Sequence, residues 1–83
     1  MTGREKLTAW RDEMERKGKT WKVTEAFDDR PWTLTPARVM AEVVGVVERR
    51  EPVRDRVLDR SLQLARKAGC IVYDGTPKRW RWA

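Results

Sequence analysis

The chain has 83 residues and a formal net charge of +6, from 19 Lys and Arg against 13 Asp and Glu. This length suits one domain and leaves no room for two hydrophobic cores. One cysteine and no histidine exclude an internal disulfide, a Cys/His zinc site and an imidazole general base. We therefore expect a protein without catalytic activity, bound metal or cofactor.

The apolar residues show no pattern typical of a membrane segment. The longest apolar runs, such as residues 43–47, are far shorter than the roughly 20 residues of a membrane span. The N-terminal residues lack the apolar stretch of a signal segment. These observations predict a cytoplasmic protein that does not contact membranes.

Positive charge is concentrated in the later part of the chain. Residues 1–30 hold eight basic and seven acidic side chains, whereas residues 31–83 hold eleven basic and six acidic ones. A cationic surplus confined to one region is typical of a surface that contacts nucleic acid. The residues after position 30 are therefore where a binding site is expected.

The first predicted element is a helix over residues 4–17. Thr2 and Glu5 have the spacing of a capping box, and Gly18 stands where helices commonly end. The apolar residues of this helix form one narrow stripe, made of Leu7, Trp10 and Met14. This stripe either covers the core of the domain or forms the contact of a homodimer.

The next stretch, residues 20–29, gives mixed signals. Residues 20–23 alternate like a strand, but one helical face collects Val23, Ala26 and Phe27. We favour a short helix here. Residues 32–34 are then predicted to form a short strand.

A longer helix is predicted to begin at Thr35 and Pro36. A threonine oxygen suits the N-cap, and a proline at the first helical position loses no useful N–H donor. This helix either ends at Gly45 or continues into residues 46–52.

A third helix is predicted over about residues 53–68, after a second start signal at the Glu51-Pro52 step. Gly69 closes it. Its core face is wide and consists of Val57, Leu58, Ser61, Leu62, Leu64, Ala65 and Ala68.

The last segment changes from a helical period to a strand period. Strands are predicted over residues 70–73 and 78–82, joined by a turn over residues 74–77. One face of this hairpin is aromatic and the other basic, because Trp80 and Trp82 alternate with Arg79 and Arg81. A two-stranded hairpin is marginal by itself, so we expect it to pair with residues 32–34.

A helix opened by Thr-Pro, a long helix ending in Ala-Gly and an immediate basic hairpin resemble the winged helix-turn-helix family of DNA-binding domains. The matching residues run from Leu34-Thr35-Pro36 to Gly45 and from Val57 to Ala68-Gly69-Cys70-Ile71. The resemblance implies an α+β fold with a three-helix core and a C-terminal β-hairpin wing. An extra N-terminal helix over residues 1–18 precedes the winged domain over residues 19–83. The chain departs from the family pattern at residues 46–52, which exceed the tight turn of a simple helix-turn-helix.

The predicted recognition helix, about residues 53–68, carries polar side chains opposite its apolar face. Three cations and an amide form one row, Arg56, Arg60, Gln63 and Lys67. Arginine can read guanine, glutamine can read adenine and lysine neutralises phosphate. The resemblance implies that Arg56 and Arg60 contact bases. Asp59 lies alongside and either accepts from cytosine or, as we favour, pairs with one of these arginines.

The wing, residues 74–82, is expected on the DNA backbone or in the minor groove, with a stiff tip at Thr76-Pro77. The candidate DNA-binding residues are therefore Arg54, Arg56, Asp59, Arg60, Gln63, Lys67, Thr76, Lys78, Arg79 and Arg81. These residues predict a small protein that binds double-stranded DNA. It would act either as a transcriptional regulator or as a phage- or plasmid-type DNA-processing accessory. Such a protein would associate with the nucleoid.

Two other functions stay open. The basic residues can be ordinary solvated surface on a winged helix that docks another protein. Alternatively, Trp80 and Trp82 can stack on the bases of single-stranded nucleic acid. We favour packing roles for all five tryptophans. The acidic groups at residues 28–29, Glu48 and Glu51 are interpreted as a turn and a solvated linker.

Overall fold

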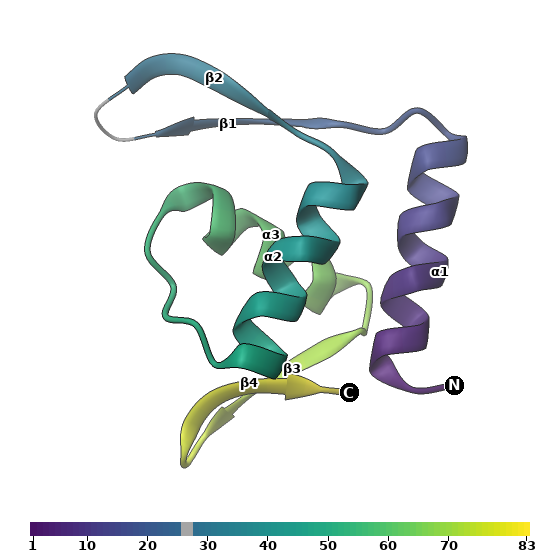
Figure 1. Cartoon of the computed structure of the whole chain (residues 1–83), viewed down its shortest axis with the longest axis vertical. Helices are drawn as coiled ribbons and strands as arrows, with labels where there is room; N and C mark the ends of the chain where they lie inside the picture. The colour runs from purple at the N-terminus through teal and green to yellow at the C-terminus, as the bar shows by residue number, and fades with distance from the viewer. Residues whose placement is uncertain (26–27) are drawn as a thin grey trace.

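A computed structural model describes residues 1–25 and 28–83, with only the backbone of Asp28 and Asp29 (Figure 1). The described chain is α+β, with three helices and two antiparallel hairpins, each a separate two-stranded sheet. In order, the elements are α1 (Gly3–Arg16), β1 (Trp21–Glu25), β2 (Asp28–Leu34), α2 (Pro36–Arg49), α3 (Arg56–Lys67), β3 (Ile71–Gly75) and β4 (Lys78–Trp82).

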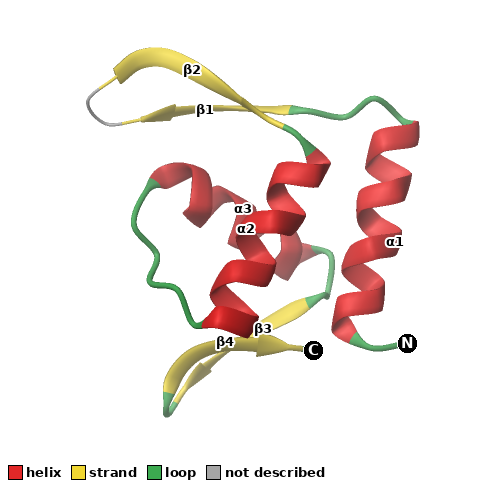
Figure 2. Cartoon of the chain, in the orientation of Figure 1, coloured by secondary structure: helices red, strands yellow, loops and turns green. Residues whose placement is uncertain are grey.

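The two hairpins lie at opposite ends of a helical layer. In Figure 2, α1 stands beside α2, α3 passes behind α2, and the hairpins cross above and below them. Helix α2 packs against both other helices, while α3 also packs against β1 and β3. The core between these elements consists of apolar side chains, and those of Leu7, Val39, Val43, Leu58 and Leu62 are fully buried.

Helix α1 has the ends that the sequence predicted. Thr2 Oγ1 accepts from the Glu5 backbone N–H, and the Glu5 side chain accepts from the Thr2 N–H, so the capping box is present. Gly18 has a φ of 67°, and its N–H donates to the carbonyl of Glu15. A glycine in this left-handed conformation is the usual way to end a helix.

The prediction of a short helix within residues 20–29 is wrong, because the described residues of this segment belong to the strands β1 and β2. Trp21 lies opposite Leu34, and Val23 opposite Trp32. Burial explains the outcome, since alternation along the strands places Val23 and Leu34 in the core. Ala26 and Phe27, which suggested a helical face, lie outside the described residues.

The predicted strand over residues 32–34 is confirmed as part of β2, but its predicted partner is wrong. It pairs with β1, and the C-terminal hairpin forms its own sheet. The end of β1 instead lies against the first turn of α3. There the backbone N–H of Val57 donates to Glu25 Oε1 at 3.4 Å.

Helix α2 begins at Pro36, as predicted, with Thr35 Oγ1 accepting from the Arg38 N–H. Of the two predicted endings, Gly45 is wrong, and the helix continues to Arg49. The extra turn buries Val46 on the face of the helix that faces the core. Arg50 then takes the left-handed conformation, with a φ of 55°, and its N–H donates to the Gly45 carbonyl.

Helix α3 begins at Arg56, three residues later than the predicted start. Asp55 is its N-cap and accepts from the Leu58 N–H at 2.7 Å. The Glu51-Pro52 step therefore lies in the loop between α2 and α3. The other end matches the prediction, since Gly69 has a φ of 78° and the Cys70 N–H donates to the Ala65 carbonyl.

The C-terminal hairpin is confirmed, with a turn shorter than predicted. Strand β3 extends through Asp74 to Gly75, so only Thr76 and Pro77 connect it to β4. Its last residues reach α1, where the Ala83 N–H donates to the Cys70 carbonyl beside Gly3. Leu7 of α1 is fully buried. Helix α1 is therefore packed into the same core as the other elements. The prediction of a three-helix core with a further N-terminal helix is wrong in this respect, because the described residues form three helices in all and α1 is one of them.

Candidate nucleic-acid interface

Helix α3 separates its apolar and polar side chains as the sequence predicted. Its buried face consists of Val57, Leu58, Ser61, Leu62 and Ala65. Of the other two residues predicted for this face, Leu64 is half-buried, and the prediction for Ala68 is wrong, because Ala68 is exposed at the C-cap. On the opposite side Arg56, Arg60 and Lys67 are exposed, and Gln63 is half-buried. Asp59 is exposed beside this row. We name the three cations, Arg56, Arg60 and Lys67, the α3 basic row.

The α3 basic row has few partners within the molecule. In the part of the chain that the structure describes, neither Arg60 nor Lys67 makes a hydrogen bond or ion pair. Arg56 makes one long hydrogen bond, at 3.4 Å, to the carbonyl of Thr24. The predicted salt bridge from Asp59 to Arg56 or Arg60 is wrong, because Asp59 makes no ion pair within the described residues. The positive charge of the row is thus available to an external anion.

Gln63 is less free than the sequence suggested. Its Oε1 accepts from Arg66 Nε at 2.9 Å, one turn along the helix. The amide oxygen is therefore engaged, and only the NH₂ group is left to donate.

Arg54 was predicted as a DNA-binding residue, but acidic side chains surround it. Its guanidinium nitrogens lie 3.8 Å from Glu42, 3.7 Å from Glu51 and 3.9 Å from Asp55. It belongs to the loop before α3 and not to the α3 basic row. Its charge is already balanced by these carboxylates.

The hairpin β3–β4 does not have the purely basic face that the sequence predicted. Asp74 lies opposite Arg79 in the strand register. Its Oδ2 is 2.8 Å from Arg81 Nε and 3.9 Å from Arg79 Nε. At the tip, Thr76 and Lys78 are exposed, and within the described residues neither has a side-chain partner.

The tryptophans of β4 pack as we favoured. Trp80 and Trp82 are half-buried against the core, and Trp80 contacts Tyr73 with ring centroids 5.1 Å apart and ring planes at 58°. Trp10 and Trp21 stack at 5.5 Å and also pack on the core. The packing role predicted for Trp32 is wrong in part, because 54% of this residue is exposed.

The predicted homodimer stripe on α1 mostly faces its own chain. Leu7 is fully buried, Trp10 stacks on Trp21, and Met14 is half-buried. A homodimer through this helix stays a prediction. It would have to use the exposed residues of α1.

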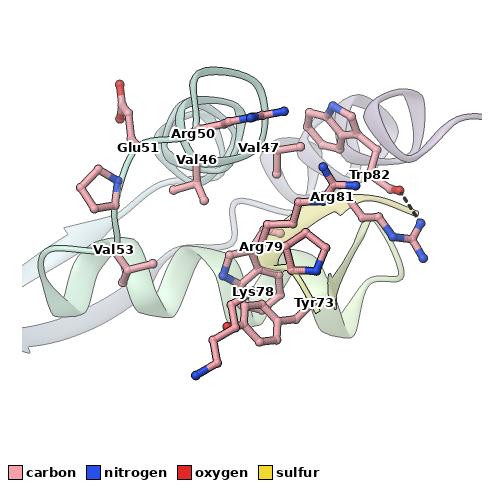
Figure 3. A pocket seen from close by; sticks show the side chains of 13 residues that line it. Val46, Val47, Arg50, Glu51, Val53, Tyr73, Lys78, Arg79, Arg81 and Trp82 are labelled. Carbon is pink, nitrogen blue, oxygen red and sulfur yellow. Dashed lines mark hydrogen bonds between the residues drawn. The ribbon is translucent and has the colours of Figure 1, made fainter. Parts of the chain in front are cut away.

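A groove that the sequence did not predict lies between the end of α2 and the C-terminal hairpin (Figure 3). Its volume is about 700 Å³, and its lining includes Arg50, Val53 and Tyr73. These side chains come from segments far apart in the sequence. The one available signal was the strand alternation that places Tyr73 on the same hairpin face as Trp80.

The acidic residues singled out in the sequence are Asp28, Asp29, Glu48 and Glu51. The linker role predicted for Glu48 is wrong, because this residue lies in the last turn of α2, where it pairs with Arg4. Glu51 does lie in the loop after α2 and pairs with Arg49 and Arg54. The turn predicted at residues 28–29 is also wrong, because their backbone belongs to β2; their side chains lie outside the described residues. Over residues 1–25 and 28–83, no three His, Cys, Asp or Glu side chains are grouped so that they could hold a metal ion. None of the helices found there is long and apolar enough to span a bilayer.

Comparison with known proteins adds no family or relative to this description. No protein-family model, curated protein or solved structure matches the chain.

Proposed function

We propose that this protein binds double-stranded DNA, with α3 in the major groove and the tip of hairpin β3–β4 against neighbouring phosphates. In this proposal the fold is a winged helix-turn-helix, and β3–β4 is the wing. The observation that carries the proposal is the α3 basic row, whose cations are exposed and lack carboxylate partners among the described residues.

The dimensions and chemistry of α3 support the proposal. A helix of 12 residues is about 18 Å long at about 1.5 Å per residue, and the major groove admits a helix. Arg56 and Arg60 lie in the first turns of α3, where an arginine fork suits guanine. Lys67 lies at the last turn and suits a phosphate.

The two hairpins flank α3, since α3 packs against β1 on one side and β3 on the other. Lys78 at the tip of the wing is exposed and has no carboxylate partner in the described chain. It is therefore the wing cation best placed to reach a phosphate. Arg79 and Arg81 contribute less, because Asp74 already attracts both.

Two features depart from the simple family pattern. Strand β2 pairs with β1, and residues 50–55 connect α2 to α3. The α3 basic row lies on the opposite face of α3 from the core, and Arg56 is its one member that contacts the β1–β2 hairpin, through the Thr24 carbonyl. The biological role that fits is a regulator of transcription or an accessory factor in DNA processing.

The test is a fluorescence anisotropy titration with a labelled random-sequence duplex of 20 base pairs at fixed salt. The Arg56→Ala/Arg60→Ala variant is expected to bind at least about tenfold more weakly than the natural protein, since affinity for a random-sequence duplex depends on the cations that face it and this variant removes two of them. The control is Arg16→Ala/Lys19→Ala, which removes the same charge from exposed positions at the end of α1.

The control should change the affinity by less than about threefold, because its charges are remote from the proposed contact. Equal losses in both variants would mean that only net charge matters, and absence of binding by the natural protein would exclude the function. Circular dichroism of each variant checks that the fold is intact.

A further inference from the structure

The groove between α2 and the C-terminal hairpin is distinct from the α3 basic row. Figure 3 shows Val46 and Val47 of α2 on one side, Val53 of the following loop on another, and the hairpin side chains beyond. Its volume of about 700 Å³ lies within the roughly 300–1,000 Å³ of ligand pockets. It is therefore large enough to take several side chains of a partner.

Eight of the thirteen residues that line this groove are apolar, and some of these are exposed. Four large hydrophobic residues of the described chain are exposed, and two of them, Val53 at 47% and Tyr73 at 51%, line it. The half-buried Trp80 and Trp82 form part of the same wall. Apolar side chains gathered in one exposed place are typical of an interaction site.

The rim of the groove is positively charged. Four of its thirteen lining residues are cationic, Arg50, Lys78, Arg79 and Arg81, and one is acidic, Glu51. The Glu51 carboxylate is already held by Arg49 at 3.2 Å and Arg54 at 3.7 Å. Arg50 and Lys78 come from opposite sides and make no ion pair within the described residues. The groove therefore complements an apolar partner that carries negative charge.

The geometry favours a peptide over unpaired bases. Base stacking needs the free face of an aromatic ring. Tyr73 is tilted against Trp80, and both groove tryptophans pack on the core. The other wall is aliphatic, with Val46, Val47 and Val53. Such a wall suits the alkyl and aromatic side chains of a peptide.

We propose that this groove binds a short acidic segment of a partner protein, with apolar side chains between Val53 and Tyr73 and carboxylates on Arg50 and Lys78. The proposal goes beyond DNA binding. The groove shares Lys78 with the proposed DNA contact but includes no residue of the α3 basic row, so a partner in the groove leaves that row exposed.

The experiment uses a displayed library of random 12-residue peptides, selected on the full chain and counter-selected on the Val53→Ser/Tyr73→Ser variant. Both substitutions change exposed side chains, so the fold is expected to persist. Selected peptides should be enriched in Asp and Glu near Leu, Ile, Phe or Trp. A synthetic peptide of the enriched sequence should bind the natural chain at least tenfold more tightly than it binds this variant.

The charge requirement has its own variant, Arg50→Gln/Lys78→Gln, on which the same peptide should again bind at least tenfold more weakly. The Arg60→Ala/Lys67→Ala variant is the matched control and should bind the peptide as the natural chain does. This control keeps the two proposals separable, because it should lose affinity for duplex DNA. Failure of DNA binding in the natural chain would leave the peptide result interpretable.

Three results would overturn the proposal. The first is a selection without enrichment of acidic residues, and the second is a peptide that binds the Val53→Ser/Tyr73→Ser variant equally well. The third is a 12-nucleotide oligothymidylate that binds the natural chain and loses affinity in that variant while no peptide does so. This last outcome would assign the groove to single-stranded nucleic acid.

Discussion

The α3 basic row and the hairpin β3–β4 each contain three cations and one nearby aspartate, yet their electrostatics differ. In the hairpin, the strand register places Asp74 opposite Arg79 and within 2.8 Å of Arg81. On α3, Asp59 makes no ion pair in the described chain, and Arg56 donates to a carbonyl of β1 instead. The number of cations is thus a poor guide to available charge, which depends on where the backbone places the carboxylates.

The positions of Asp74, Arg79 and Arg81 depend on the hairpin β3–β4 being packed firmly against α1. Gly3 of α1 lies where a Cβ atom would collide with the Cys70 carbonyl oxygen and come within 2.7 Å of the Ala83 nitrogen. Both are backbone atoms, so no side-chain rotation relieves the collision. Gly3→Val is expected to lower the free energy of unfolding by about 1–3 kcal/mol, the range for overpacked sites.

Urea unfolding followed by circular dichroism measures this effect. Ala9→Val, at an exposed position of α1, is the control and should cost no more than about 0.7 kcal/mol of helix propensity. A second readout is alkylation of Cys70, because burial raises the pKa of this thiol and shields it. Faster alkylation is expected in Gly3→Val, and identical stability of the two variants would refute the tight packing of α1 on the hairpin.

Removing the Asp74 carboxylate should make the positive charge of the hairpin β3–β4 as available as that of the α3 basic row. Asp74→Asn frees Arg79 and Arg81, so the affinity for duplex DNA is expected to rise about twofold to fivefold, in line with exposed ion pairs of up to about 1 kcal/mol. Asp12→Asn makes the same charge change on α1, where Asp12 pairs with Arg11. An equal gain from both variants would show that the hairpin is not near the DNA.

The Glu13–Lys17 ion pair on α1 belongs to neither proposed binding site, so it serves as a reference for the exposed ion pairs of the hairpin. Lys17 Nζ lies 3.0 Å from Glu13 Oε1, and this hydrogen bond and charge hold the pKa of Glu13 below its ordinary value of 4.5. A carboxyl group whose pKa is lowered by folding stabilises the fold above its unfolded pKa. That contribution is lost as the pH falls through the folded pKa.

The effect is expected to be small, because the pair is exposed. An NMR titration of the Glu13 carboxyl should give a midpoint below 4.5, and Lys17→Gln should raise it. A midpoint that does not respond to Lys17→Gln would mean that the pair does not persist in solution.

Local signals predicted the helices and the C-terminal hairpin well. Thr2, Thr35 and Gly69 act at helix ends through bonds within a few residues, and a single sequence contains that information. The period of 3.6 residues likewise identified the exposed row of α3.

The misplaced elements depend on distant contacts. Strand β1 is stabilised by Leu34, Trp10 and the first turn of α3, none of which is near it in sequence. The last turn of α2 exists because Val46 enters the core. The sequence predicts Asp74 in a turn, but β3 extends two residues further, to Gly75, and Asp74 pairs with two arginines. The groove joins residues 46–53 to residues 73–82, so no local pattern could reveal it.

The most direct test of the account is the salt dependence of duplex binding between 50 and 200 mM salt for the natural chain and two double variants. Each lost phosphate contact should lower the slope of log affinity against log salt by about 0.9. We predict a decrease of up to about 1.8 for Arg60→Ala/Lys67→Ala and of less than about 0.9 for Arg79→Ala/Arg81→Ala. An unchanged slope in the first variant, or a larger decrease in the second, would contradict the assignment of DNA binding to α3.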